Sequence, residues 1–327
     1  MQNILNITNG DCALAIMQQA ELPGRYLPWR DILHDGPVPA DLSLTELSQV
    51  RAQFIIDCGW GKPDAIRQSF LERDTQLAAY QQYDKVILWF EHDLYDQLQL
   101  LQLLDWFAHQ PAANTMLTMI CTEQYLGRLT PQQMSDLYQF EQAITAQHLL
   151  LAKQAWAAFR SASPEPWQQL LQQDTSALPF LHAAILRVLQ EYPNCQHGLS
   201  RTAFTALDLI AKGESKPGEL FSRYQDTEQC IFLGDSSFWK ILNHLLHAKP
   251  ALIALNAGEQ IDLPINPEQQ LSITAAGEAV LAGQQYAANI MSPRWIGGVH
   301  LTQDNLWCWD EGAQQIRCQT TNTVKTR

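Results

Sequence analysis

The chain has 327 residues, of which 46% are hydrophobic and 17% are charged, and its formal net charge is −13. This length predicts two or more domains, and the composition is ordinary for a globular protein. The acidic balance argues against a large nucleic-acid-binding surface, because contacts to phosphates need clustered Lys and Arg.

The first half of the chain alternates between apolar strands and helices. Strands are expected at Asn3–Thr8, Arg25–Pro28, Asp84–Glu91 and Asn114–Thr122. Helices are expected at Cys12–Ala20, Ser43–Cys58, Pro63–Tyr83 and Leu94–Ala108. The sequence DKVILWFE gives the clearest strand, because a continuous apolar run is typical of a strand buried on both faces. Strands separated by helices predict an α/β fold with a Rossmann-like, mostly parallel sheet in residues 1–125.

The second half is predicted to contain a helical region followed by a winged-helix-like domain. Residues 126–195 are expected to be helical and connecting, with a helix near Thr130 and another at Pro179–Glu191. In residues 196–290, elements are expected at Thr202–Ala211, Pro217–Tyr224, Asp235–Leu246, Ala251–Leu255 and Leu271–Thr274. Three helices followed by a hairpin are the layout of a winged helix-turn-helix domain. Residues 291–327 are predicted to form a C-terminal hairpin and tail.

The predicted winged-helix domain carries little positive charge for DNA binding. From Arg187 to Glu278, seven Lys and Arg residues stand against eleven Asp and Glu residues. Its candidate recognition helix, Asp235–Leu246, contributes only Lys240 to the positive charge. Binding to DNA is therefore disfavoured, and a protein partner fits this domain better.

Cysteine use and the N-terminal segment predict a cytoplasmic protein with no membrane partner. The chain has seven cysteines, an odd number, and none of them forms a Cys-x-x-Cys pair. A chain of this length does not need disulfide bonds for stability, so we expect reduced thiols. The opening MQNILNITNGD lacks the features of a signal peptide. No segment approaches the roughly 18 apolar residues of a membrane span.

Polar side chains follow every strand of the predicted sheet. The strands are followed by Asn9-Gly10-Asp11, Trp29-Arg30-Asp31, Glu91-His92-Asp93 and Thr122-Glu123. Ligands of open parallel sheets bind outside the carboxyl ends of the strands, so these groups are expected at one functional edge. Helix capping alone would account for Asp11 or Asp93, but it does not account for the other motifs.

This edge is predicted to bind a polar ligand or to catalyse a reaction. The candidate catalytic residues are Asp11, Arg30, Asp31, Glu91, His92 and Asp93, and the candidate binding residues are Asn9, Gly10 and Gln97. Clustered carboxylates repel one another unless a cation or a shared proton neutralises them. Oxygen ligands suit Mg²⁺ or Mn²⁺, although the spacing matches no known metal motif and we assign no metal ligand.

Phosphate chemistry is the enzymatic interpretation of the same edge. Arg30 would hold a phosphate with two hydrogen bonds, and His92 or His34 would transfer protons near neutral pH. Together these groups predict metal-assisted hydrolysis of a phosphoester, with a phosphorylated or nucleotide-like ligand.

Other interpretations lead to different chemistry. A lone glycine after the first strand is not a dinucleotide-binding motif, and Cys12 is more often structural than nucleophilic. One open alternative is a regulatory or adaptor protein without enzymatic activity, whose winged-helix domain contacts protein or DNA. Another is a structural role for the motifs, in which Arg30 forms buried ion pairs with Glu91 or Asp93.

The N-terminal motifs resemble those of a bacterial family called domain of unknown function 1835. The matching segments are Asn9–Asp11, Trp29–Asp31 with Asp35–Val38, and Trp89–Asp93 with Tyr95–Gln97. Shorter segments at Gly198–Thr202, Phe232–Asp235 and Arg294–Gly298 are similar to the C-terminal half of longer members. The resemblance implies that the strand-end residues belong to one pattern. It implies no activity.

Overall fold

The computed structural model describes residues 2–319, which divide into two compact units. Residues up to Ile185 form the first unit, and residues from Leu186 onward form the second. The predicted connecting region, residues 126–195, is thus shared between the two units and its larger part belongs to the first. Among residues 2–319, no helix combines the length and apolar character that a membrane span requires.

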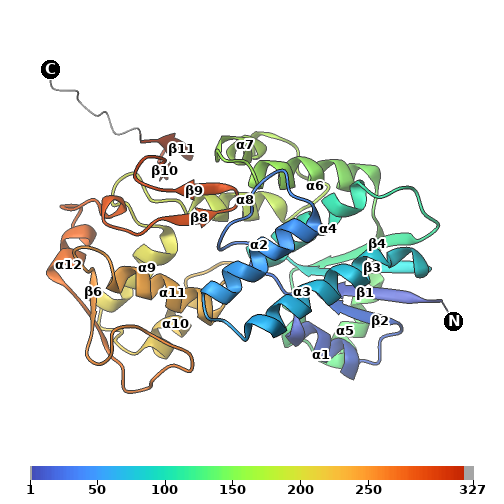
Figure 1. The fold of residues 1–327 in the computed structure, drawn as a ribbon, viewed down its shortest axis with the longest axis horizontal. Helices are drawn as coiled ribbons and strands as arrows, with labels where there is room; N and C mark the ends of the chain where they lie inside the picture. The colour runs from blue at the N-terminus through green and yellow to red at the C-terminus, as the bar shows by residue number, and fades with distance from the viewer. Residues whose placement is uncertain (1, 320–327) are drawn as a thin grey trace. The chain divides into compact units, whose positions relative to one another are not determined.

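A five-stranded sheet forms the centre of the first unit (Figure 1). Its strands are β1 (Ile4–Thr8), β2 (Arg25–Pro28), β3 (Lys85–Glu91), β4 (Met116–Thr122) and β5 (Gln142–Ala143). They lie in the order β2-β1-β3-β4-β5, and every neighbouring pair is parallel except β4 and β5. The prediction of a mostly parallel N-terminal sheet is confirmed. The antiparallel strand β5 was not predicted, because it has only two residues and both are exposed.

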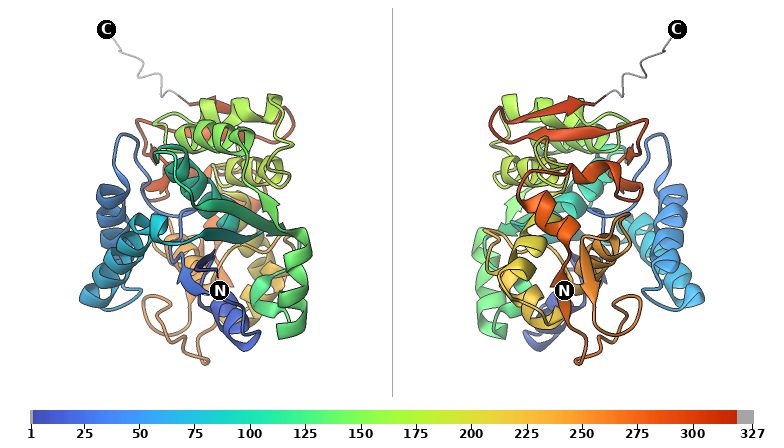
Figure 2. Two further views of the ribbon diagram at one scale, coloured as in Figure 1. Left: turned by 90° about the vertical axis from the view of Figure 1, so that its right-hand side faces the viewer. Right: turned by 90° about the vertical axis from the view of Figure 1, so that its left-hand side faces the viewer.

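Helices cover both faces of this sheet (Figures 1 and 2). The helices of the first unit are α1 (Asp11–Gln19), α2 (Leu44–Asp57), α3 (Pro63–Ala78), α4 (Leu94–Ala108), α5 (Pro131–Asp136), α6 (Ala146–Phe159) and α7 (Glu165–Gln169), and α8 (Leu181–Leu189) follows them. Short 3-10 helices lie at Tyr80–Gln82, Leu126–Arg128, Leu137–Phe140 and Leu170–Gln172. In Figure 1, α4 and α6 lie above the sheet and α1 and α5 lie below it.

The alternation of side chains along β3 explains these two layers. Ile87 and Trp89 belong to a hydrophobic cluster with residues of α1 and α5. Val86, Leu88 and Phe90 alternate with them along the strand, and all five side chains are completely buried. A strand with two apolar faces can be stable only inside a sheet that is covered on both sides.

Local sequence also determines where the helices begin. At the start of α2, Ser43 and Glu46 form a capping box, in which each side chain bonds the backbone N–H of the other residue. Pro63 occupies the first position of α3, where its missing N–H has no consequence. Asp93 caps α4 by accepting hydrogen bonds from two backbone N–H groups.

The strand order places a topological switch point between β1 and β3. The chain moves from β1 to β2 on one side and then crosses to β3 on the other side of β1. In open α/β sheets, ligands bind in the crevice where the strand order reverses in this way, beyond the carboxyl ends of the strands. A ligand site is therefore expected at the residues that follow Thr8 and Phe90.

Up to residue 319, the second unit contains short helices and three antiparallel hairpins. Its helices are α9 (Arg201–Ala211), α10 (Pro217–Gln225), α11 (Asp235–Leu246), α12 (Ala275–Leu281) and a 3-10 helix at Ala287–Asn289. The hairpins pair β6 (Ile253–Leu255) with β7 (Leu271–Ile273), β8 (Arg294–Ile296) with β9 (Val299–Leu301), and β10 (Trp307–Asp310) with β11 (Gln315–Cys318).

A disulfide bond between Cys195 and Cys308 contradicts the expectation of reduced thiols for this pair. The two residues are 113 positions apart in sequence, and their Cα atoms are 5.1 Å apart. Backbone hydrogen bonds that join Trp309 to Pro193 and Cys195 bring them together, which no sequence spacing indicates. Disulfide bonds are rare in the cytosol, so this bond weakens the basis of the expected cytoplasmic location, which stays a prediction.

Candidate functional site

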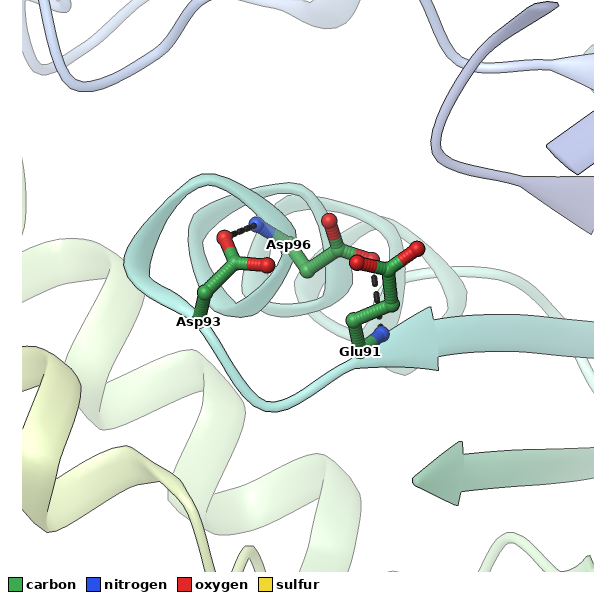
Figure 3. A group of neighbouring side chains, drawn as sticks. All are labelled: Glu91, Asp93 and Asp96. Carbon is green, nitrogen blue, oxygen red and sulfur yellow. Dashed lines mark hydrogen bonds between the residues drawn. The ribbon is translucent and has the colours of Figure 1, made fainter. Parts of the chain in front are cut away.

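Three buried carboxylates meet at the carboxyl end of β3 (Figure 3). Glu91 ends the strand, Asp93 caps α4 and Asp96 lies in the first turn of that helix. We call these three residues the carboxylate cluster. One oxygen atom of each lies within 4.8 Å of the others, although the residues are only 5%, 3% and 1% exposed. Within residues 2–319, none of the three forms an ion pair with Lys, Arg or His.

Backbone N–H groups fix one oxygen atom of each carboxylate in the cluster. Glu91 Oε1 accepts a hydrogen bond of 2.7 Å from the Leu126 N–H. Asp93 Oδ1 accepts bonds of 2.9 Å and 3.3 Å from the N–H groups of Tyr95 and Asp96. Asp96 Oδ1 accepts a bond of 2.6 Å from the Glu91 N–H. The protein thus orients each carboxylate through neutral dipoles. Among residues 2–319 no cationic side chain forms an ion pair with the cluster, although the charge of Arg128 acts against burial to lower the pKa of Glu91.

Asn9 connects β1 to the carboxylate cluster across the switch point. Its Nδ2 donates to Glu91 Oε1 and to Asp96 Oδ2, each at 2.9 Å. Its backbone oxygen accepts a hydrogen bond of 3.2 Å from the Tyr95 hydroxyl. The structure therefore brings together three of the predicted site residues, Asn9, Glu91 and Asp93, at the place where open α/β sheets bind ligands.

Burial raises the pKa of every carboxyl group in the cluster. It raises the pKa of Asp93 to about 8, with a further contribution from the charge of Glu91. Burial also raises the pKa of Asp96, where the charge of Asp93 adds to the effect, and the pKa of Glu91. The cluster therefore retains protons at neutral pH in the absence of a cation.

Asp96 was missing from the candidate residues of the sequence analysis. Its position, the third residue after the N-cap Asp93, usually marks a side chain that returns to the backbone of the cap residue. Here the side chain reaches further back and bonds the N–H of Glu91, at the end of the strand. The close spacing of acidic residues at positions 91, 93 and 96 is the sequence feature that could have indicated a role for Asp96.

Arg30 and Asp11 form a solvent-exposed ion pair beside the carboxylate cluster. Arg30 Nη2 lies 2.6 Å from Asp11 Oδ1, and its Nε donates to both oxygen atoms of the same carboxylate. The two side chains are 47% and 66% exposed. The interpretation in which Arg30 forms buried ion pairs with Glu91 or Asp93 is therefore wrong.

The buried ion pair after β2 involves Asp31 and Arg51, and Arg30 takes no part in it. Asp31 Oδ1 lies 2.9 Å from Arg51 Nε and its Oδ2 lies 3.8 Å from Arg73 Nη1, and its side chain is completely buried. Arg51 also donates to the backbone oxygen atoms of Ile32, Asp35 and Pro37. Asp31 thus helps hold the loop after β2, and its carboxylate is not part of the cluster.

His92 is half-buried and forms no hydrogen bond with the carboxylate cluster. Its ring lies 5.1 Å from that of Tyr125 and 5.9 Å from that of Phe180, and its Nδ1 is buried without a hydrogen-bond partner among residues 2–319. Burial lowers its pKa, against the effect of a hydrogen bond with the backbone of Thr122. His34, the other candidate for proton transfer, lies 6.0 Å from the Tyr95 ring.

The two remaining candidates for ligand binding are Gln97 and Gly10. Gln97 Nε2 donates to the Glu91 backbone oxygen at 2.7 Å and so holds the end of the strand. Gly10 precedes α1 with an extended backbone, and a Cβ atom there would meet no atom within 4 Å. Glycine is therefore not required at this position by the conformation of the chain.

Comparisons with known proteins provide no further assignment of the site. The sequence matches no family model and no curated protein sequence. The resemblance to domain of unknown function 1835 therefore stays a prediction, and the interpretation of the site depends on its geometry.

The two ion pairs after β2 predict different effects on stability. Asp31→Ala leaves the charge of Arg51 buried and unpaired, so it should lower the free energy of unfolding by about 3–5 kcal/mol. Arg30→Met removes an exposed pair and should change it by less than about 1 kcal/mol. Urea denaturation of both variants measures the difference. Equal losses in the two variants would contradict the assignment of Asp31 as the structural residue.

The carboxylate cluster also predicts a pH-dependent stability. The pKa of Asp93 rises from 3.8 in the unfolded chain to about 8 in the folded protein, so the folded state holds more protons between these values. Stability should therefore be greatest at low pH within this window and should fall as the pH rises through 8. One such proton gives a slope of about 1.4 kcal/mol per pH unit.

Urea denaturation between pH 5 and pH 9, with EDTA present, measures this slope. Asp93→Asn is the matched variant, because asparagine still caps α4 but carries no titrating proton. The slope should be smaller in this variant than in the wild type. Identical pH profiles for the two proteins would show that Asp93 ionises normally.

Proposed function

We propose that the carboxylate cluster binds a divalent cation, Mg²⁺ or Mn²⁺, and that the surrounding edge binds a phosphorylated or nucleotide-like molecule. The observation that carries this proposal is the presence of three buried carboxylates without a cationic partner among residues 2–319. Such a group is stable only with bound protons or a cation. Carboxylate oxygen atoms are the ligands that Mg²⁺ and Mn²⁺ prefer.

The hydrogen bonds of the cluster are compatible with metal binding. The carboxyl groups of Glu91 and Asp93 also hydrogen-bond each other, through a proton that a bound cation would replace. Asp96 Oδ2 accepts only the bond from Asn9. Each carboxylate thus has one oxygen held by backbone amides and another that no backbone amide holds. Fixing metal ligands through such neighbouring hydrogen bonds is the usual arrangement in metal sites.

The residues beside the cluster support an anionic ligand. Arg30 follows β2, the strand next to β1, and it retains N–H groups that do not bond Asp11. The hydrogen bond with Asp11 raises the pKa of Arg30, so this guanidinium stays charged. Gly10 leaves space at the end of β1. A phosphate near the cluster would lie between the bound divalent cation and the guanidinium of Arg30.

The reaction that suits these groups is hydrolysis of a phosphoester. A divalent cation at the cluster would polarise a phosphoryl oxygen and bind the phosphate. Arg30 would stabilise negative charge on the phosphate through its remaining N–H groups. We assign no role in proton transfer to His92, because it does not contact the cluster.

Titration with Mn²⁺ by calorimetry tests the cation site. The wild type should bind one Mn²⁺, and Asp96→Asn or Glu91→Gln should weaken binding by at least about tenfold. Asp11→Asn is the matched control, because it removes an exposed carboxylate at the same edge, and it should leave the affinity unchanged. Circular dichroism of each variant confirms that it is folded.

Two results would contradict the cation site. One is the absence of any Mn²⁺ binding by the wild type at millimolar concentration. The other is equal affinity in the wild type, Asp96→Asn and Glu91→Gln. Release of nitrophenol from bis-p-nitrophenyl phosphate with Mn²⁺ present tests the enzymatic part, and Arg30→Met should reduce it without changing the Mn²⁺ affinity.

A second candidate function rests on the second unit. There, α9, α10 and α11 precede the β6–β7 hairpin and α12, an order that favours a winged-helix module. Several of its cations are already paired with acidic side chains, in the pairs Lys212–Asp208, Lys216–Glu219 and Arg223–Glu214. We propose that this module contacts a protein partner and that the chain acts as a regulator or adaptor.

Fluorescence anisotropy with a labelled DNA duplex tests the choice of partner. The full chain should show no saturable binding below about 10 μM protein at about 50 mM salt, because few free cations are available for phosphates. Saturable binding that weakens as salt is added would contradict the proposal and would support a DNA-binding role.

A further inference from the structure

A second site is indicated by a cavity of about 300 Å³ against α4, beside α6 and the start of α2. Figure 1 shows α4 and α6 side by side on the same face of the sheet. Residues that line the cavity include Leu47, Gln102, Asp105, Trp106, Trp156 and Arg160. Gln102 follows Asp96 by six residues on α4, so the cavity begins about 9 Å along the helix from the carboxylate cluster.

Two tryptophans provide aromatic surface in this cavity. Trp106 comes from α4 and Trp156 comes from α6. Trp156 is 2% exposed. Its indole N–H has no hydrogen-bond partner among residues 2–319, and this group keeps some contact with solvent. Buried polar groups are normally hydrogen-bonded, so this donor is available to a molecule in the cavity.

Gln102 supplies a second buried donor. Its Oε1 accepts a hydrogen bond of 2.8 Å from Trp29 Nε1, which fixes the orientation of the side-chain amide. Its NH₂ group has no partner among residues 2–319, although the residue is 2% exposed. Like the Trp156 indole N–H, this NH₂ group keeps some contact with solvent.

Asp105 supplies an acceptor in the same cavity. Its carboxylate accepts no hydrogen bond from residues 2–319, and its only ion pair is a long one, 3.7 Å to His109 Nδ1. Burial raises the pKa of Asp105, against the charges of His109 and Arg160. Arg160 forms no ion pair with Asp105 among residues 2–319 and donates to the backbone oxygen atoms of Pro39 and Leu42 at 2.9 Å and 3.0 Å. These two bonds hold the loop before α2 against α6 and so shape the cavity.

We propose that this cavity binds a planar nitrogen heterocycle, namely a purine base. The Trp106 ring would contact one of its faces. The N–H groups of Gln102 and Trp156 would donate to its ring nitrogen or carbonyl acceptors, and Asp105 would accept from a ring N–H or an exocyclic amino group. The volume lies at the lower end of the range for ligand pockets, which suits a base better than a whole nucleotide.

Calorimetric titration of the full chain with adenine and with hypoxanthine tests this proposal. At least one base should bind with a stoichiometry of one. Trp156→Phe keeps an aromatic ring but removes the N–H, and Asp105→Asn keeps the shape but removes the charge. Each variant should weaken binding by at least about tenfold, as expected when one buried hydrogen bond is lost.

Two controls separate this site from the carboxylate cluster. Binding of the base should be unchanged in Asp96→Asn and in the presence of EDTA, because neither affects the cavity. Indole has a similar size but offers no ring acceptor, so it should bind at least about tenfold more weakly than the base.

The proposal is overturned if neither base binds at millimolar concentration, or if Trp156→Phe and Asp105→Asn both bind with the affinity of the wild type. It is also overturned if indole binds as tightly as the base, since the cavity would then recognise only apolar surface. Loss of base binding in Asp96→Asn would place the base at the cluster instead of the cavity.

Discussion

Repulsion between carboxylates in a medium of low polarity is the constraint on which the edge of the sheet depends. Glu91, Asp93 and Asp96 come from one short segment that passes from β3 into α4, so the chain cannot separate them. Among residues 2–319 their hydrogen-bond donors are backbone N–H groups and the amide of Asn9, and the charge of Arg128 acts on Glu91 without an ion pair. Dipoles of this kind orient the carboxylates, but they do not cancel three charges. Protons or a cation must complete the arrangement, and this requirement links the fold to the proposed function.

The segment after β2 shows how adjacent residues come to have different roles. Arg30 and Asp31 are neighbours in sequence, yet Arg30 lies in solvent with Asp11, and Asp31 is buried with Arg51. An exposed pair can be broken by a ligand at little cost, whereas a buried pair cannot. Arg30 is therefore suited to bind an anion, and Asp31 is suited to hold the loop that presents it. A sequence motif alone does not separate these roles, because both residues are charged and both follow a strand.

Sequence patterns predicted the elements whose boundaries are marked by local signals. The strand Arg25–Pro28 and the helix Leu94–Ala108 agree with the structure at both ends, because a glycine turn and an N-cap aspartate mark them. Features that depend on distant partners were missed. Strand β5 exists only because it pairs with β4, and Cys195 meets Cys308 only through the pairing of segments far apart in the chain. In the same way, the partner of Asp31 lies on α2, where nothing in the local sequence identifies it.

Anomalous diffraction from a crystal soaked in Mn²⁺ locates a cation bound to the protein without reference to activity. We expect one strong anomalous peak among Glu91, Asp93 and Asp96, with oxygen atoms of at least two of them at about 2.1 Å. An empty cluster in a crystal that binds Mn²⁺ elsewhere, for instance at the exposed carboxylate of Asp11, would contradict it. The three carboxylates would then be held together by shared protons alone.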